Sequence, residues 1–135
     1  MFNGAVGFLT RIGVPLAGSR VLAVRGRSSG EWRTTPVNPL RVQGMRYLVA
    51  PRGHTQWVKN MRAAGCGELR KGRTAEVFTA VEVADAEKPP ILRAYLTAWA
   101  WEVGRFFDGV DASSPEEKLR EIAPDFPVFR IEAAA

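Results

Sequence analysis

Short apolar runs, each bounded by glycine, proline or another turn-forming residue, constrain the fold of this chain most strongly. Six runs have the length and residue types of strands, at residues 20–25, 34–42, 46–50, 68–71, 74–83 and 127–132. Short strands with turn signals between them are typical of antiparallel barrels and sandwiches rather than of parallel sheets. The pattern therefore predicts a small, mostly antiparallel barrel of about six strands.

Two prolines restrict where the second of these strands can lie. Pro36 and Pro39 both fall within residues 34–42 and remove two backbone donors from that strand. A strand that lacks donors is confined to a sheet edge or to a bulge. Gln43 and Gly44 follow as a turn signal, which predicts a hairpin between this strand and residues 46–50.

Helices are expected between the strands, so the predicted class is α+β. Thr55 and Gly65 bracket a short helix as its N-cap and its stop. Residues 91–107 repeat apolar side chains at spacings of three and four, which indicates the strongest helix. Residues 114–117 (Ser-Pro-Glu-Glu) form a capping box that starts a helix ending before Pro124.

Residues 2–17 are apolar but carry three glycines, a proline and Arg11. This stretch is too short to span a bilayer, and it lacks the positive n-region of a signal peptide. Its spacing predicts a short amphipathic helix that packs over the mouth of the barrel. Contact of this helix with a membrane surface is the minority alternative.

The composition indicates one globular domain over residues 1–135. The chain is 46% hydrophobic and 24% charged, and it contains no repeat, linker or low-complexity tract. Its net charge of +5 favours an anionic partner without selecting one. Cys66 is the only cysteine and His54 the only histidine, so we expect no disulfide, no metal site and a reducing, cytoplasmic location.

Residues 26–36 (Gly-Arg-Ser-Ser-Gly-Glu-Trp-Arg-Thr-Thr-Pro) concentrate groups that bind anions between two predicted strands. The glycines allow a close backbone approach, the serines offer hydroxyl donors, and Arg27 and Arg33 offer guanidinium groups suited to phosphate. The stretch matches neither the phosphate loop of nucleotide hydrolases nor the dinucleotide fingerprint. An ordinary polar turn whose arginines face water is the alternative reading.

A second candidate region precedes the short helix. Pro51, Arg52, Gly53 and His54 form a loop that leads to the free N–H groups at the helix N-terminus, which favour an anionic or carbonyl-bearing group. A lone histidine in such a loop more often faces solvent than takes part in catalysis. Trp101 lies off the apolar stripe of residues 91–107, where cover by another segment is commoner than stacking on a ligand.

The motif Gly-Arg-x-Ser-Gly-x-x-Arg-Thr-x-Pro, followed by a strand pair and a Trp-x-x-Asn-x-x-Ala helix, resembles the deazaflavin-dependent nitroreductase family. This family belongs to the split β-barrel flavin-binding superfamily, and the resemblance covers about residues 21–64. It implies an α+β split antiparallel β-barrel with flanking helices and coenzyme F420 as the cofactor. The implied phosphate contacts are Arg27, Ser28, Ser29, Arg33, Thr34, Thr35 and Pro36. The implied ring contacts are Ala50, Pro51, Arg52, Gly53, Gln56, Trp57 and Asn60.

The resemblance also implies an F420H2-dependent reductase that gives a hydride to a quinone, an activated alkene or a nitroaromatic. The cofactor performs the chemistry in such enzymes, so the catalytic residues stay unassigned. The tyrosine-rich segment of nitroreductive members is absent, and its general region holds Trp99, Trp101, Phe106 and Phe107. The physiological substrate is therefore not implied, and the protein is expected as a monomer or a homodimer.

Two alternatives stay open at this stage. The superfamily also binds FMN or tetrapyrroles, so the same barrel could serve a different cofactor. A basic small barrel with Trp32, Tyr47, Trp57 and Phe78 could instead bind single-stranded nucleic acid by stacking. The arginines cluster around one turn rather than alternating with aromatic residues along strands, so a nucleic-acid partner is not expected.

Overall fold

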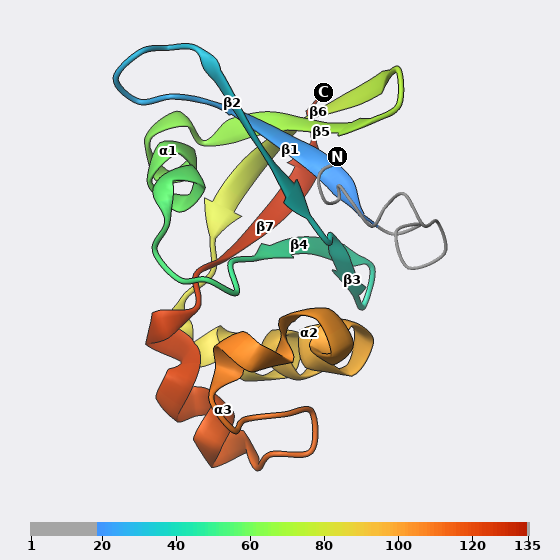
Figure 1. The fold of residues 1–135 in the computed structure, drawn as a ribbon, viewed down its shortest axis with the longest axis vertical. Coiled ribbons are helices and arrows are strands. Elements are labelled where there is room, and N and C mark those ends of the chain that lie inside the picture. The colour runs from blue at the N-terminus through green and yellow to red at the C-terminus, as the bar shows by residue number, and fades with distance from the viewer. Residues whose placement is uncertain (1–18, 135) are drawn as a thin grey trace.

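The computed structural model describes residues 19–134, in which seven antiparallel strands form one curled sheet (Figure 1). The strand order is β2-β1-β5-β6-β7-β4-β3. The strands are β1 (Arg20–Arg25), β2 (Trp32–Val37), β3 (Leu40–Val42), β4 (Met45–Val49), β5 (Cys66–Lys71), β6 (Thr74–Glu82) and β7 (Val128–Ala133). The helices are α1 (Gln56–Ala64), α2 (Lys88–Val103) and α3 (Glu116–Ile122). This is the predicted α+β architecture of a split barrel.

The predicted strand over residues 34–42 is two strands, β2 and β3, which accounts for seven strands instead of six. Asn38 and Pro39 separate them. Both strands lie at sheet edges, but at opposite edges of the same sheet. The missing donor of Pro36 requires an edge position for β2, whereas Pro39 lies outside β3, in the connection. The predicted edge position is therefore confirmed for Pro36. Residues 34–42 form parts of two strands and the connection between the two edges of the sheet.

This short connection forces the sheet to curl. Three peptide steps from Val37 to Leu40 reach at most about 11 Å. Seven strands laid flat would place the outer two about 29 Å apart, because neighbouring strands are separated by about 4.8 Å. The two edges must therefore approach each other, and the sheet takes the form of a half-barrel.

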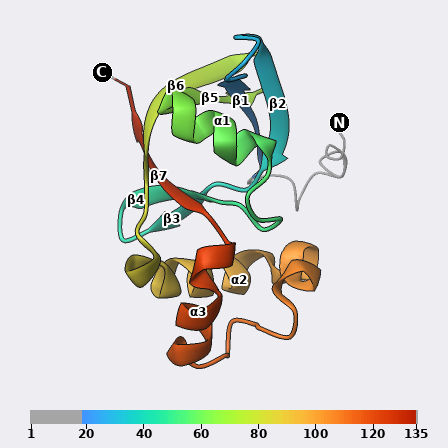
Figure 2. The ribbon, with the colours of Figure 1, turned by 90° about the vertical axis from the view of Figure 1, so that its left-hand side faces the viewer.

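Two apolar clusters stabilise the fold on either side of the strands. The first joins the inner face of the sheet to Val58 and Met61 of α1, which lies within the curl (Figure 2). The second joins α2 and α3 to the β3–β4 hairpin. Phe78 is buried in the first cluster, whereas Val77 and Val81 on the other face of β6 are 52% and 57% exposed. The two faces of β6 therefore differ in burial, and the Phe78 face is the buried one.

The predicted helix boundaries are close to those observed. Helix α1 ends at Gly65, which adopts a left-handed conformation (φ 70°) and donates its N–H to Met61 O. Helix α2 starts at Lys88, with prolines in its first turn, and continues after Val103 as the 3-10 helix Gly104–Phe107. The predicted helix over residues 2–17 lies outside the described residues. No helix within residues 19–134 is long and apolar enough to cross a membrane.

The predicted capping box at residues 114–117 is wrong. Helix α3 begins at Glu116 with Pro115 as its N-cap, and no side chain caps it. The Ser114 hydroxyl instead accepts a hydrogen bond from the backbone N–H of Asp111 (2.9 Å). Serine hydroxyls bond readily to nearby backbone groups, so a local turn competes with the helix cap.

Gly67 of β5 is expected to tolerate no side chain. A Cβ atom there would lie 2.8 Å from the backbone oxygen of Ala23 and 3.1 Å from the Phe78 ring. Because both neighbours are fully buried, Gly67→Ala should lower the free energy of unfolding by about 1–3 kcal/mol in chemical denaturation. Gly104→Ala is the matched control, since its nearest neighbour is at 3.8 Å. Equal stability of the two variants would contradict this account.

Candidate functional site

The β1–β2 loop (residues 26–31) is a compact turn closed by its own hydrogen bonds. Gly26 N–H donates to Glu31 O (2.8 Å), and Gly30 N–H donates to Gly26 O (2.9 Å). Ser29 Oγ accepts a hydrogen bond from Glu31 N–H (3.1 Å). Gly30 has φ 74°, a conformation that favours glycine. The turn is therefore shaped by its backbone, which leaves the Arg27 and Ser28 side chains exposed at its surface.

Asn60 of α1 holds this loop in place. Its Oδ1 atom accepts hydrogen bonds from both the backbone N–H (3.1 Å) and the guanidinium Nη1 (2.7 Å) of Arg27. Asn60 is only 4% exposed, and a buried polar side chain of this kind needs such partners. The position of the β1–β2 loop is thus coupled to that of helix α1.

A cavity of about 980 Å³ opens between this loop, β2, the segment after β4, α1 and the C-terminal part of α2. Its volume is at the upper end of the range of ordinary ligand pockets. Twelve of the fourteen residues predicted to bind the cofactor line it, namely Arg27, Ser28, Ser29, Arg33, Thr34, Thr35, Pro36, Pro51, Arg52, Gln56, Trp57 and Asn60. The structure therefore brings two distant parts of the sequence to one concave surface.

The other two predicted residues, Ala50 and Gly53, do not line the cavity. Ala50 is buried, and its backbone N–H donates to Pro127 O (2.9 Å). Gly53 takes a left-handed conformation (φ 86°), and its N–H donates to Ala50 O (3.1 Å). Both residues shape the turn behind the cavity wall, which places Pro51 and Arg52 on its surface.

Several cavity residues were not predicted. They are Gly26, Val37, Asn38, Val49, Thr55, Tyr95, Glu102, Val103 and Arg105. Of the aromatic residues expected in the general substrate region, Phe106 lines the cavity, whereas Trp99, Trp101 and Phe107 are absent from its lining. The local pattern of residues 91–107 indicates a helix but not which side faces a ligand, so tertiary packing alone reveals this wall.

The charges on the cavity lining are mostly positive. The lining contains four arginines but only one carboxylate, Glu102. The arginines are Arg27, Arg33, Arg52 and Arg105. Within residues 19–134 none of these four guanidinium groups forms a salt bridge. Unneutralised positive charge in a concave site attracts anions. The cavity is consequently suited to a ligand with several negative groups.

Thr55 supplies an unsatisfied polar atom at the same surface. It occupies the N-cap position of α1, but its side chain makes no capping hydrogen bond. Its Oγ1 atom is buried and has no partner within the described part of the chain. Buried polar atoms are nearly always hydrogen-bonded, so this hydroxyl can bond to a ligand at the helix N-terminus.

Tyr95 of α2 contributes a phenol to the opposite wall. The side chain is 2% exposed, and burial raises the pKa of Tyr95 above its ordinary value. The Glu102 carboxylate raises it further, and a hydrogen bond with Asn38 partly opposes these effects. Tyr95 therefore stays protonated near neutral pH, where it can donate a hydrogen bond but cannot act as a base.

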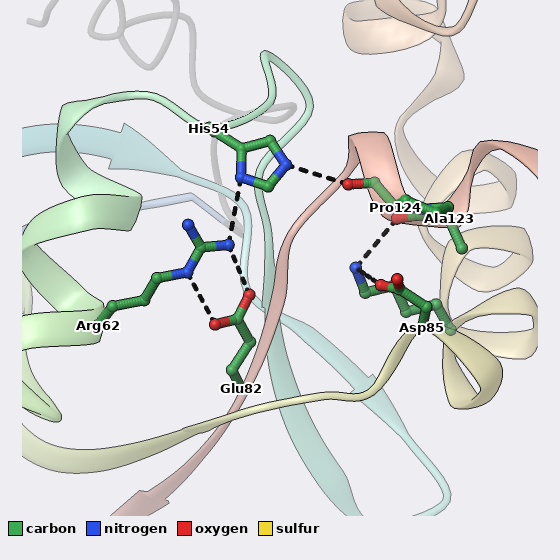
Figure 3. A network of polar contacts seen from close by, with 7 residues as sticks. His54, Arg62, Glu82, Asp85, Ala123 and Pro124 are labelled. Carbon is green, nitrogen blue, oxygen red and sulfur yellow. Dashed lines mark hydrogen bonds and ion pairs between the residues drawn. The ribbon is translucent and has the colours of Figure 1, made fainter.

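His54 lies beside the cavity in a polar network (Figure 3). Arg62 of α1 donates from Nη2 to His54 Nδ1 (3.2 Å), and His54 Nε2 lies 3.0 Å from Pro124 O. Because Arg62 can only donate, the neutral ring must carry its proton on Nε2 and donate it to Pro124. His54 is exposed and absent from the cavity lining, so it braces the segment before α1.

Two ion pairs complete this network. Arg62 binds both carboxylate oxygens of Glu82 at 2.8 and 2.7 Å. The buried Lys88 bonds to Asp85 (2.7 Å) and to Ala123 O (3.0 Å), which ties the start of α2 to the 3-10 helix Ala123–Asp125 (Figure 3). The network therefore connects α1, β6 and the helical layer. No cluster of His, Cys, Asp and Glu that could hold a metal ion occurs in the described residues.

A family model described as F420H(2)-dependent quinone reductase matches residues 3–106 of the chain. A comparison with curated proteins found no match. The family match covers the β1–β2 loop, α1 and all of α2, and so includes every segment that lines the cavity.

Solved structures with similar folds include an F420-H2 dependent reductase, at 20% identity and a TM-score of 0.56, over 86% of this chain and 95% of that one. A conserved hypothetical protein from Mycobacterium tuberculosis is 16% identical, with a TM-score of 0.56, over 100% of this chain and 82% of that one. A protein of unknown function from Agrobacterium tumefaciens is 16% identical, with a TM-score of 0.62, over 87% of this chain and 49% of that one. The chain thus spans about half the length of the Agrobacterium protein. At these identities the likeness establishes the split-barrel fold alone.

The Arg62–Glu82 pair should make stability depend on pH. Hydrogen bonds from Arg62 hold the pKa of the Glu82 carboxyl below its ordinary value, although burial opposes them. The stabilisation is therefore complete above the unfolded pKa of about 4.3 and is lost as the pH falls through the lower folded pKa. The side chains are 37% and 35% exposed, so the effect is at most about 1 kcal/mol.

We expect Glu82→Gln to lower the free energy of unfolding at neutral pH and to lower it less in strongly acidic solution. Urea denaturation of both proteins at the two pH values measures this difference. Glu121→Gln is the matched control because the Lys118–Glu121 pair is longer (3.2 Å) and more exposed. A Glu82→Gln effect of the same size at both pH values would refute the assigned role of this pair.

Proposed function

Because the chain belongs to the F420H(2)-dependent quinone reductase family, we propose that it passes a hydride from reduced coenzyme F420 to an electron-poor small molecule in this cavity. Family membership makes it an oxidoreductase that uses this coenzyme. The acceptor is a quinone in the first instance, with activated alkenes and nitroaromatics as the related classes. The single observation that carries the proposal is the convergence of twelve predicted residues on one concave surface.

The described residues fit a coenzyme that carries a phosphodiester and a planar ring. The β1–β2 loop is a backbone-shaped turn with exposed serine and arginine donors, which suits a phosphate group. The unbonded hydroxyl of Thr55 and the first N–H groups of α1 suit a carbonyl at a ring edge. These two features lie on the same cavity, as one ligand with both chemistries would require.

Each segment has a distinct role in this proposal. Arg27, Ser28, Ser29, Arg33, Thr34, Thr35 and Pro36 hold the phosphate region, and Pro51, Arg52, Gln56 and Trp57 border the ring. Asn60 contributes mainly by orienting Arg27, because its oxygen already accepts two hydrogen bonds from that residue. Ala50 and Gly53 act indirectly by shaping the turn that places Pro51 and Arg52.

The opposite wall orients the acceptor. When bound, reduced F420 supplies a hydride, and a quinone that takes this hydride and one proton becomes a hydroquinone. Val103 and Phe106 present an apolar surface against which a planar acceptor can pack. Tyr95, held in its protonated form, can donate a hydrogen bond to an acceptor oxygen as negative charge develops there. Solvent water supplies the proton in this proposal, so no side chain of the cavity is assigned as the proton donor.

Arg33→Ala should weaken the binding of F420 while the protein stays folded. Arg33 lines the cavity, is exposed and forms no salt bridge among the described residues, so its loss removes a charge-assisted hydrogen bond without exposing a core. The expected loss of affinity is about 1–3 kcal/mol. Arg73→Ala, in the exposed turn between β5 and β6, removes the same charge away from the cavity and should leave affinity within about twofold. An unchanged affinity of Arg33→Ala would exclude the phosphate role.

A fluorescence titration with oxidised F420, run in parallel with FMN at the same salt concentration, tests the coenzyme itself. We expect saturable binding of F420 and weaker or no binding of FMN. Reduction of a quinone by pre-reduced F420, followed by the return of the oxidised absorbance, then tests the activity. Preferential binding of FMN would overturn the proposed coenzyme role of the cavity.

A further inference from the structure

One corner of the cavity carries charge that the proposed phosphate contacts do not use. It is formed by Arg52 from the segment after β4 and by Glu102, Val103, Arg105 and Phe106 from the end of α2 and the following 3-10 helix. This group is called the Phe106 corner. Helix α2 lies at the opposite end of the fold from the β1–β2 loop (Figure 2), and both contribute to the lining of the cavity. The Phe106 corner is therefore the surface left for the hydride acceptor.

Two guanidinium groups are held at the same aromatic ring in this corner. The central carbon of Arg105 lies 4.9 Å from the centroid of the Phe106 ring, and that of Arg52 lies 5.2 Å from it. These distances are within the range of cation–π attraction. Contact with the ring restrains both side chains and leaves their N–H donors available. Two restrained arginines next to an apolar ring can bind a planar molecule with an anionic substituent.

The arginines are not neutralised by the protein. Neither Arg52 nor Arg105 pairs with a carboxylate within residues 19–134, and Glu102 is the one acidic side chain on the cavity lining. The corner therefore has two cations and one anion. The two arginines would attract a bound anion, and the Glu102 carboxylate would repel it. Substitutions of Arg105 and Glu102 should thus change anion binding in opposite directions.

We propose that the Phe106 corner is an anion subsite for the hydride acceptor, so that the protein selects electron-poor rings with a carboxylate or sulfonate substituent over neutral ones. This inference rests on the proposed function, since it assigns the acceptor to the same cavity. Carboxylates of the coenzyme itself have the same chemistry, and the experiment below separates the two sources. The coenzyme phosphate is assigned to Arg27 and Arg33. Arg105 is therefore left for the acceptor, and Arg52, which borders the coenzyme ring, lies between the two ligands.

The test compares a naphthoquinone sulfonate with neutral naphthoquinone as acceptors. In steady-state reduction by F420H2, Arg105→Gln should raise KM for the sulfonate about tenfold and change KM for the neutral quinone less than twofold, as expected for the loss of one charge-assisted hydrogen bond. Glu102→Gln should lower KM for the sulfonate. Arg105→Lys, which keeps the charge, should recover part of the loss, and Arg73→Gln should have no effect.

A binding titration gives a second readout that does not depend on turnover. Quenching of tryptophan fluorescence by the naphthoquinone sulfonate, measured with oxidised F420 present, should be weakened about tenfold in Arg105→Gln, while the Kd of F420 is unchanged. Equal losses for the sulfonate and the neutral quinone would overturn the inference. A loss of F420 affinity in Arg105→Gln would assign the corner to the coenzyme and overturn it as well.

Failure of the proposed function gives a different result. In that case the unmodified protein would bind no F420, or would bind it and reduce neither quinone. If it reduces the neutral quinone and shows no preference that depends on Arg105 and Glu102, the reductase activity stands and the anion subsite is wrong.

Discussion

The two-residue connection between β2 and β3 is the constraint on which the rest of the structure depends. It joins the two outer strands of one seven-stranded sheet, so the sheet can satisfy it only by curling until its edges approach each other. The curl encloses α1 and creates the apolar cluster beneath it (Figure 2). It also places the β1–β2 loop, the segment after β4 and the end of α2 around one opening, and the cavity is the space that they leave.

Helix α1 transmits this arrangement to the candidate site. On one side Asn60 accepts two hydrogen bonds from Arg27 and orients the β1–β2 loop. On the other side Arg62 contacts His54 and Glu82, and His54 reaches the 3-10 helix before β7 (Figure 3). A polar bond network of this kind has few alternative geometries, so it can define loop positions that apolar packing alone would leave variable. These hydrogen bonds thus hold the β1–β2 loop and the segment before α1 in place on either side of the helix.

Local sequence predicted the elements well wherever the relevant chemistry is local. The run Arg20–Arg25 is a strand with its predicted bounds, and Gly65 ends α1 in the left-handed conformation expected of it. Pro36 confines β2 to an edge because a missing donor has the same effect in any fold. The capping box at residues 114–117 failed because Asp111, which the motif does not include, bonds to the serine hydroxyl instead.

Residue types indicated that residues 26–36 could bind an anion, because glycine flexibility and arginine chemistry do not depend on the fold. The individual contact residues were implied by the family resemblance of the sequence. Twelve of the fourteen residues implied in this way line the cavity. Tertiary structure decided the remaining features of the site. Asn60 accepts hydrogen bonds from Arg27, and Ala50 and Gly53 lie behind the lining of the cavity. Arg105 and Phe106 belong to the side of the cavity that α2 and the following 3-10 helix form. These features depend on which segments come into contact after the sheet curls, and the sequence pattern of a single segment does not determine its tertiary contacts.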